Sequence, residues 1–345
     1  MAGSPPHSSD HFPATPRPSE GVARFYADTE SDLETVSELL RAGELVALPT
    51  ETVYGLAADA LNPAACARIF TVKGRPLIDP LIVHVAGKEA ARELAFWSEE
   101  AESVATAFWP GPLTIVLRKR AIVPDLITAG RPSVALRSPE HPLAREVLRR
   151  CRCPLAAPSA NPFGYLSPTE AHHVRDSLGD QVTHILDGGP CRWGVESTIV
   201  DLQEPVTPRI LRPGAITAED LEAVLGRPVT TVTKATDTPE APGMLERHYS
   251  PQTPLCLFSW DAPHLPPTGN RARVYLKKPE GSSPVGREDF WLSENGSLKE
   301  AARHLYALLR RLDRMGFGLI EVEKAPDEGI GRAYNDRLRR AAAKR

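Results

Sequence analysis

The sequence predicts an α/β protein with two unequal parts. From about residue 23 to residue 225, short apolar strand patterns alternate with helical patterns. Residues 228–254 lack apolar periodicity and are rich in Thr, Pro and Ala, which is typical of a linker. The alternation resumes at residue 255. Strands that alternate with helices indicate sheets covered by helices, and in the second part a small parallel sheet.

The elements of the first part follow from periodicity and capping residues. Leu33, Val36, Leu39 and Leu40 recur at helical spacing. Asn62–Pro63 predicts a helix start, because Asn caps a helix and Pro suits its first position. Ser167–Glu170 has the pattern of a capping box and predicts another helix, and a short helix is expected over 220–225. Strands are expected over 44–48, 82–85, 113–117, 134–137, 155–157, 183–186, 197–202 and 209–211.

The second part shows the same kinds of signal. Ser297 precedes a long amphipathic pattern over 298–315, and a basic helix is expected over 332–342. Strands are expected over 255–258, 274–276 and 318–322. The organisation predicted is therefore a disordered tail (1–22, rich in Pro, Ser and His), an α/β domain (23–227), a linker (228–254) and a smaller α/β domain (255–345).

Composition excludes several classes of protein. The net charge of −3 argues against a chain that is a basic nucleic-acid binder as a whole, so any affinity for RNA would come from a local patch. The five cysteines are odd in number and lack Cys-x-x-Cys spacing, which argues against a zinc ribbon or a disulfide framework. No apolar run could span a membrane, and no secretory leader is visible. We expect a cytoplasmic protein.

The common nucleotide and hydrolase motifs are absent. There is no P-loop, no Gly-x-Gly-x-x-Gly after a strand, no His-Glu-x-x-His and no Gly-x-Ser-x-Gly. Lys73 and Arg75 stand two residues apart on an irregular turn, where they would point convergently. A point charge beside a planar donor fork suits a polyphosphate, although a solvated basic turn would look the same.

Other candidate residues lie at strand ends. Ser159 and Asn161 follow a strand of small residues and could face a cleft, or could satisfy their own turn. Arg137 ends a strand and is a natural partner for a carboxylate, whereas a cation there is often merely exposed. His84 within an apolar strand is more often structural, and Tyr249 in the linker is more often a packing anchor.

The order of nine separated segments resembles a known family. PTETVYG, K-x-R, PLIVH, WPGPLT, VALR, APSAN, SPT, ESTIVD and LRPG occur in this order within residues 23–225. They resemble the YrdC-like family of threonylcarbamoyl-adenylate synthases. PGMLERHYSPQTPL and the end of the chain resemble the linker and C-terminal domain of its longer, two-domain form. The resemblance implies a twisted mixed sheet with a concave, cationic cavity and a small Rossmann-like C-terminal domain.

The resemblance also implies site residues. Lys73 and Arg75 would be catalytic, Mg²⁺ would accompany ATP, and no metal would be bound by the protein itself. Threonine would be held by Thr52, His84, Arg137, Ala157 and Ser197. ATP would be held by Arg75, Asp79, Ser133, Ser159, Asn161, Ser167, Arg212 and Tyr249. Asp79 departs from the Asn that is common in the family, and an acid there would repel phosphate unless it bound a metal or was turned away.

The activity implied is the condensation of L-threonine, bicarbonate and ATP to threonylcarbamoyl-AMP and pyrophosphate. The product would pass to a downstream threonylcarbamoyl transferase complex, for N6-threonylcarbamoyladenosine in tRNA next to the anticodon. A weak tRNA contact is a further expectation. The reaction needs no covalent enzyme intermediate, which agrees with the lack of a nucleophile motif. Because the intermediates need shielding from water, the linker is expected to close over the cavity as a lid when ligand binds.

Three alternatives stay open at this point. One is a non-catalytic RNA-binding module that uses the cavity cations and the basic terminal helix. Another is a carbamoyl-adenylate enzyme of the hydrogenase-maturation type, although those proteins carry Cys-x-x-Cys zinc motifs that this chain lacks. The third, compatible with the main interpretation, is that the C-terminal domain is regulatory rather than a support for the lid and pocket.

Overall fold

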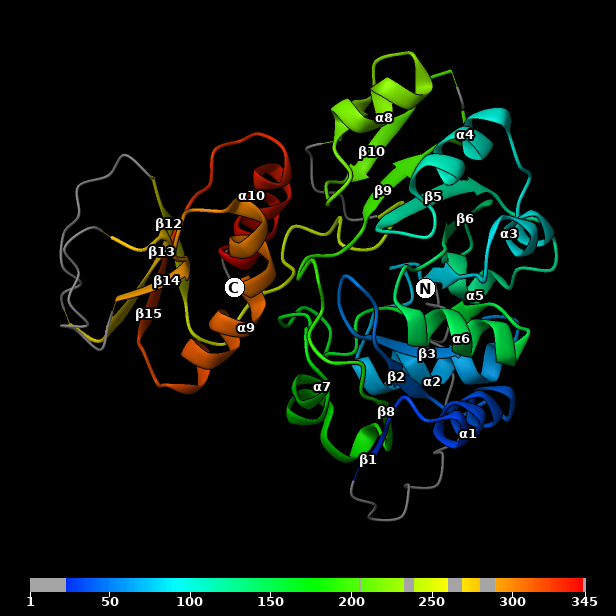
Figure 1. Ribbon diagram of the computed structural model, residues 1–345, viewed down its shortest axis with the longest axis horizontal. Coiled ribbons are helices and arrows are strands. Elements are labelled where there is room, and N and C mark those ends of the chain that lie inside the picture. The colour runs from blue at the N-terminus through cyan, green and yellow to red at the C-terminus, as the bar shows by residue number, and fades with distance from the viewer. Residues whose placement is uncertain (1–22, 205, 233–238, 260–268, 280–288, 344–345) are drawn as a thin grey trace, which may run out of the picture.

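The computed structural model describes residues 23–204, 206–232, 239–259, 269–279 and 289–343. The predicted α/β class is confirmed: an eleven-stranded mixed sheet and a four-stranded parallel sheet are each accompanied by helices (Figure 1). The predicted tail over 1–22 and residues 233–238 of the linker lie outside the described residues. Within the described residues, no helix is both long and apolar enough to cross a bilayer.

The large sheet takes its strands from the first two thirds of the chain. Their order is β1-β8-β2-β3-β7-β4-β6-β5-β9-β10-β11. Their bounds are β1 Arg24–Tyr26, β2 Val46–Leu48, β3 Gly55–Asp59, β4 Ile82–His84, β5 Leu113–Arg118, β6 Ser133–Arg137, β7 Leu155–Ala156, β8 His184–Leu186, β9 Thr198–Asp201, β10 Arg209–Arg212 and β11 Thr230–Thr231.

Helices cover the large sheet and bury apolar faces on it. Helix α1 buries Leu33, Val36 and Leu40, the residues whose spacing predicts it. Asn62 caps α2 as predicted, since its side chain accepts from the Ala65 amide. The bounds are α1 Glu30–Arg41, α2 Pro63–Lys73, α3 Lys88–Leu94, α4 Glu99–Phe108, α5 Asp125–Thr128, α6 Pro142–Cys151, α7 Ala171–Leu178, the 3₁₀ helix Gly179–Gln181 and α8 Ala218–Leu225.

The sheet register places two polar residues of the sequence analysis side by side. Strand β4 pairs in parallel with β6, and His84 lies opposite Arg137. On the side of β4 away from β6, strand β7 pairs antiparallel with β4. The loop that leads from β7 to Ser159 therefore begins beside β4. Strand β9 pairs antiparallel with β10, which ends at Arg212. Segments far apart in the sequence thereby meet at one region of the sheet.

The capping box predicted over Ser167–Glu170 is wrong, although the helix after it exists as α7. The N-cap of α7 is Glu170, and no side chain caps the helix. The Ser167 hydroxyl instead donates to the Glu196 carboxylate, with an O–O distance of 2.6 Å. A buried carboxylate is a stronger acceptor than the local turn offers, so the tertiary contact is made in place of the cap. Strands β1, β3, β11 and β14 were not predicted, and β11 lies within the predicted linker.

The second sheet is parallel, as predicted, with the order β12-β15-β13-β14. Ser297 caps α9 as expected, accepting from the Glu300 amide. We propose that residues 255–345 form a domain of their own. The bounds are β12 Leu255–Phe258, β13 Arg271–Lys277, β14 Asp289–Ser293, α9 Leu298–Arg314, β15 Leu319–Glu323 and α10 Ile330–Ala341.

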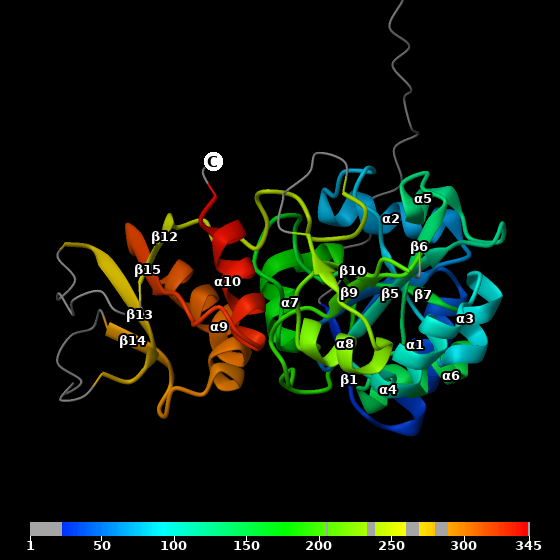
Figure 2. The same ribbon diagram turned by 90° about the horizontal axis from the view of Figure 1, so that it is seen from above.

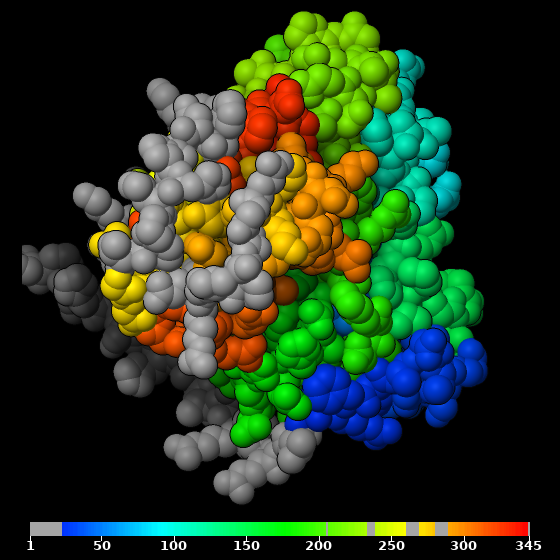
Figure 3. All heavy atoms as spheres, turned by 60° about the vertical axis from the view of Figure 1, so that its left-hand side comes forward, coloured from blue at the N-terminus to red at the C-terminus, as the bar shows by residue number. Residues whose placement is uncertain are grey.

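Helices α9 and α10 lie between the two sheets (Figures 1 and 2). In Figure 3 the orange and red residues of the C-terminal part come forward and border on green residues of the first part. Arg310 of α9 is buried there and donates to the carbonyls of Leu166 and Ser167 and to the Ser177 hydroxyl. Tyr165 donates to Asp313 at 2.8 Å. Buried, directed contacts therefore join the two parts.

Candidate functional site

A cavity lies where the strand ends of the large sheet meet the linker. It is lined by residues from β4, β6, β10, the β2–β3 loop, the loop after β7 and linker residues 242–249. The lining residues are Thr52, Val53, Arg75, Ile82, His84, Arg137, Ala157, Pro158, Ser159, Glu196, Arg212, Pro242, Gly243, His248 and Tyr249. Three buried arginines and one buried carboxylate, Glu196, are among them.

Eight of the predicted site residues line this cavity, and the others lie outside its lining. The eight are Thr52, Arg75, His84, Arg137, Ala157, Ser159, Arg212 and Tyr249. The others are Lys73, Asp79, Ser133, Asn161, Ser167 and Ser197, all of them buried. Glu196 was not predicted as a site residue, although its place directly before Ser197 in the ESTIVD segment is a signal that could have found it. The other lining residues that were not predicted are Val53, Ile82, Pro158, Pro242, Gly243 and His248.

Arg137 is held by a buried carboxylate. Its Nη2 atom lies 2.7 Å from Glu51 Oε1, and both side chains are buried. Its Nε atom donates to the carbonyl of Gly111. The second oxygen of Glu51 has no hydrogen-bond partner in the described structure. The guanidinium is therefore fixed in orientation at the cavity wall.

His84 is a neutral imidazole in this setting. Burial, and then the positive charge of Arg137, lower its pKa to about 3. Its Nδ1 atom is buried without a hydrogen-bond partner among the described residues. A neutral ring beside Arg137 can exchange a hydrogen bond with a ligand without adding charge.

The buried His84 makes the protein sensitive to acid. The pKa of His84 is lower in the folded state than its ordinary 6.5, so between about pH 6.5 and 3 the unfolded chain binds more protons. The free energy of unfolding therefore falls as the pH falls, by about 2 kcal/mol from this group at pH 5. Urea denaturation at pH 7 and pH 5 should show this fall in the free energy of unfolding in the wild type and in the control His172→Gln, whose side chain is exposed. An equally large fall in His84→Gln would contradict the assignment of this effect to His84.

Arg75, which also lines the cavity, forms a buried pair with Asp79. Arg75 donates from Nε to the Asp79 carbonyl at 3.0 Å and from Nη2 to the Pro80 carbonyl at 2.7 Å. Nη2 also lies 2.9 Å from Asp79 Oδ2. Burial raises the pKa of Asp79, while Arg75 opposes that shift. Arg75 lines the cavity and Asp79 stands behind it.

Lys73 and Arg75 do not converge on one point, although the sequence places them two residues apart. Gly74 between them has a left-handed backbone, with φ of 60°, and ends helix α2. Lys73 Nζ donates to the carbonyls of Ser159 (2.6 Å) and Asn161 (2.5 Å). Burial lowers the pKa of Lys73 well below its usual range. Lys73 thus fixes the loop after β7, whose Ser159 lines the cavity.

Arg212 is bound to neutral oxygens. It donates from Nε and Nη2 to the Ser197 carbonyl, at 3.1 and 3.0 Å, and from Nη1 to the Pro242 carbonyl at 3.2 Å. Its Nη2 atom also donates to the Ser197 hydroxyl, which lies 2.7 Å from the hydroxyl of Thr114. Arg212 therefore joins strand β9 to the linker.

The linker residues that line the cavity are tightly packed. Tyr249 is buried with a left-handed backbone, φ 59°, and its ring packs against His248 and Tyr306. A Cβ atom on Gly243 would lie 2.5 Å from the Tyr249 hydroxyl, and the φ of Gly243 is 81°. Glycine is therefore required at position 243 for the linker to reach the cavity.

The carboxylates of the cavity do not form a metal centre. The described residues hold no group of three or more His, Cys, Asp or Glu side chains that could bind a metal ion. Asp79 is paired with Arg75, and both oxygens of Glu196 accept hydrogen bonds, whereas Glu51 Oε2 and Asp79 Oδ1 have no hydrogen-bond partner in the described structure. The described residues therefore do not gather the several oxygen ligands that a resident divalent cation takes.

Comparisons with known proteins agree with this arrangement. The family model of Sua5, YciO and YrdC proteins, described as "Telomere recombination", matches residues 38–214. A model described as "Threonylcarbamoyl-AMP synthase, C-terminal domain" matches residues 216–343.

Full-length relatives and a solved structure match both parts together. The threonylcarbamoyl-AMP synthase of Pyrococcus abyssi is 41% identical over 92% of this chain and 95% of its own length. That of Bacillus subtilis is 38% identical over 93% and 98%. The crystal structure of P. abyssi Sua5 complexed with L-threonine superposes with a TM-score of 0.84 at 38% identity, over 93% of this chain and 97% of that one. The chain belongs to the two-domain threonylcarbamoyl-AMP synthase family.

Proposed function

We propose that this protein is a threonylcarbamoyl-AMP synthase, which joins L-threonine, bicarbonate and ATP to give threonylcarbamoyl-AMP and pyrophosphate. The observation that carries the proposal is the cavity itself, in which Arg75, Arg137 and Arg212 are buried beside hydroxyl and backbone groups. An amino-acid carboxylate and a triphosphate are both anions, and a desolvated guanidinium binds either with directed hydrogen bonds.

Threonine is assigned to the wall that contains Arg137. Its carboxylate would pair with the Arg137 guanidinium, which Glu51 holds in place. Thr52 offers a hydroxyl group, and the neutral His84 ring offers a polar nitrogen. Ser197 lies outside the lining, and we propose that it acts through Arg212, which donates to its hydroxyl. The backbone at Ala157 completes the threonine wall. The amine left free would combine with bicarbonate to form a carbamate and release water.

ATP is assigned to the wall that contains Arg75, Arg212 and Ser159. A carbamate oxygen would attack the α-phosphorus, and the bond to pyrophosphate would break. The arginines stabilise the charge that develops there, so catalysis consists of positioning and electrostatics. Mg²⁺ would be bound by the phosphates of ATP, since the described residues hold no cluster of carboxylates that could bind it by themselves.

The remaining predicted residues act behind these walls. Lys73 holds the loop of Ser159, and Asp79 holds Arg75, so we propose that both affect ATP through those partners. Ser133, Asn161 and Ser167 are buried outside the lining of the cavity, and we propose that they shape the phosphate wall from behind. Tyr249 would cover the cavity and exclude water from the carbamate and the mixed anhydride.

We further propose that the adenylate passes to a threonylcarbamoyl transferase complex that modifies tRNA next to the anticodon. A mixed carbamic–phosphoric anhydride is hydrolysed in water, so transfer to such a partner would follow its synthesis directly. A weak contact with tRNA would serve that transfer.

The direct test is pyrophosphate release from ATP by the purified protein with bicarbonate and Mg²⁺. We expect release that depends on L-threonine and is much weaker with L-serine. The identity of the product is checked by mass spectrometry of threonylcarbamoyl-AMP. Binding of tRNA that depends on salt, with no consumption of ATP by a folded protein, would support the RNA-binding alternative instead.

A further inference from the structure

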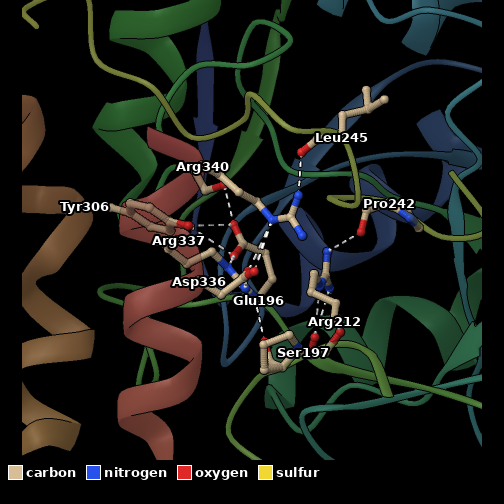
Figure 4. A network of polar contacts seen from close by, with 11 residues as sticks. Glu196, Ser197, Arg212, Pro242, Leu245, Tyr306, Asp336, Arg337 and Arg340 are labelled. Atoms are coloured by element: carbon tan, nitrogen blue, oxygen red, sulfur yellow. Dashed lines mark hydrogen bonds and ion pairs between the residues drawn. The ribbon is translucent and has the colours of Figure 1, made fainter. Parts of the chain in front are cut away.

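A buried ion-pair network joins helix α10 to the wall of the cavity (Figure 4). Its centre is Arg337, the largest fully buried side chain of the described structure. Arg337 donates from Nε to Glu196 Oε2 at 2.6 Å, from Nη1 to Asp336 Oδ2 at 2.6 Å, and from Nη2 to the Pro213 carbonyl at 3.0 Å. Glu196 lines the cavity, so the C-terminal part supplies the counter-ion of a cavity carboxylate.

Glu196 is an ionised and fully satisfied carboxylate. Its Oε1 atom accepts from the Ser167 hydroxyl at 2.6 Å, and its Oε2 atom from the Tyr306 hydroxyl at 3.1 Å. Burial alone would raise the pKa of Glu196, but the charges of Arg337 and then Arg212 hold it below its usual range. A full negative charge therefore stands in the wall of a cavity that we assign to anionic ligands.

Arg212 lines the same cavity as Glu196, and after Arg337 its charge lowers the pKa of that carboxylate most. Its hydrogen bonds within the described structure go to neutral oxygens of Ser197 and Pro242. Because Glu196 is bound by Arg337, the charge of Arg212 is not neutralised by a carboxylate in direct contact. It is therefore available to a phosphate.

We propose that Arg337 is a positioning residue for ATP binding: it binds Glu196 and thereby leaves Arg212 free to bind the phosphates. This rests on the proposed function, since it takes Arg212 to face ATP. Without Arg337, the strongest remaining cation for Glu196 is Arg212. The carboxylate would pair with it and repel the incoming phosphates. Helix α10 would then be part of the ATP site although it touches no substrate.

The same helix also contacts the linker, which gives a competing explanation to test. The guanidinium of Arg337 lies 5.2 Å from the centre of the Tyr249 ring. Arg340 donates to the Leu245 carbonyl, and its own carbonyl accepts from the His248 amide. If Arg337 acted by holding Tyr249, removing the charge of Glu196 would not restore the ATP binding that is lost with Arg337. If Arg337 acts by neutralising Glu196, removing that charge would restore ATP binding.

The experiment compares Arg337→Met, Arg337→Lys and the double variant Glu196→Gln/Arg337→Met in the full-length chain. The readouts are the ATP dissociation constant by calorimetry without threonine, and kcat and KM for ATP in the pyrophosphate assay. We expect Arg337→Met to weaken ATP binding on the order of tenfold, mainly through KM. The double variant and Arg337→Lys should lie within about threefold of the wild type, since the former removes the carboxylate and the latter keeps the cation.

Arg332→Met is the matched control. Arg332 lies on the same helix and also pairs with a carboxylate of the first part, Glu219, but this ion pair is exposed. It should bind ATP as the wild type does. A double variant as weak as Arg337→Met would overturn the proposal, and so would unaltered ATP binding in Arg337→Met. If Arg337→Met does not fold, the proposal is tested by the double variant and by Arg337→Lys alone. Weak ATP binding in either of them would overturn the proposal. Wild-type protein that binds ATP but makes no product would instead refute the proposed function, since the variants are compared by binding.

Discussion

Replacement of Arg75 by Ala is expected to lower kcat/KM for ATP by 10²-fold or more. Its guanidinium lines the cavity in a buried setting, where a charge-assisted contact to the triphosphate is weakly screened. The loss is measured by threonine-dependent pyrophosphate release at varied ATP concentration. Arg68→Ala is the matched control, since Arg68 lies on helix α2 and forms an exposed pair with Glu44. Unchanged turnover in Arg75→Ala would remove Arg75 from the site.

A stability measurement separates this effect from unfolding. Arg75→Ala leaves the buried Asp79 carboxylate without its cation, which costs about 3 kcal/mol or more when the carboxylate stays ionised. Because burial already raises the pKa of Asp79, protonation limits that cost. The double variant Arg75→Ala/Asp79→Asn should recover most of the unfolding free energy but none of the activity. Recovery of activity together with stability would show that Arg75 is only structural.

Replacement of Arg137 by Ala is expected to raise KM for threonine by about 10²-fold. The carboxylate of the substrate would lose its only proposed cation, in a wall where water cannot replace it. The measurement is pyrophosphate release at saturating ATP and varied threonine. Arg118→Ala, an exposed arginine at the end of the neighbouring strand β5, should behave as the wild type.

The effect of Arg137 should be specific to one substrate. ATP affinity by calorimetry should change by less than about threefold in Arg137→Ala, in contrast to Arg75→Ala. Because Glu51 loses its buried partner, Glu51→Gln/Arg137→Ala serves as the stability control, and it should remain defective for threonine. Equal losses for threonine and ATP would contradict the assignment of Arg137 to the threonine wall.

Much of the fold follows from local sequence. The helix that Asn62 opens and the helix that Ser297 opens begin where predicted, because a cap is set by residues within one turn. The apolar spacing of Leu33, Val36 and Leu40 likewise fixes the buried face of α1. Most residues that line the cavity stand in the segments that resemble the family, so the site was also visible in the sequence.

Contacts between distant residues were not visible there. Lys73 and Arg75 look alike in the sequence, yet Lys73 binds a loop carbonyl 86 residues away while Arg75 lines the cavity. Ser167 has the spacing of a helix cap and instead binds Glu196. The partner of Glu196 is Arg337, 141 residues further along the chain. Local sequence by itself determined many of the helices and strands, because caps and periodicity act over a few residues, and the resemblance to the family marked the segments that line the cavity. Only the tertiary structure decided which charges meet, because burial and packing select one partner among many charged residues.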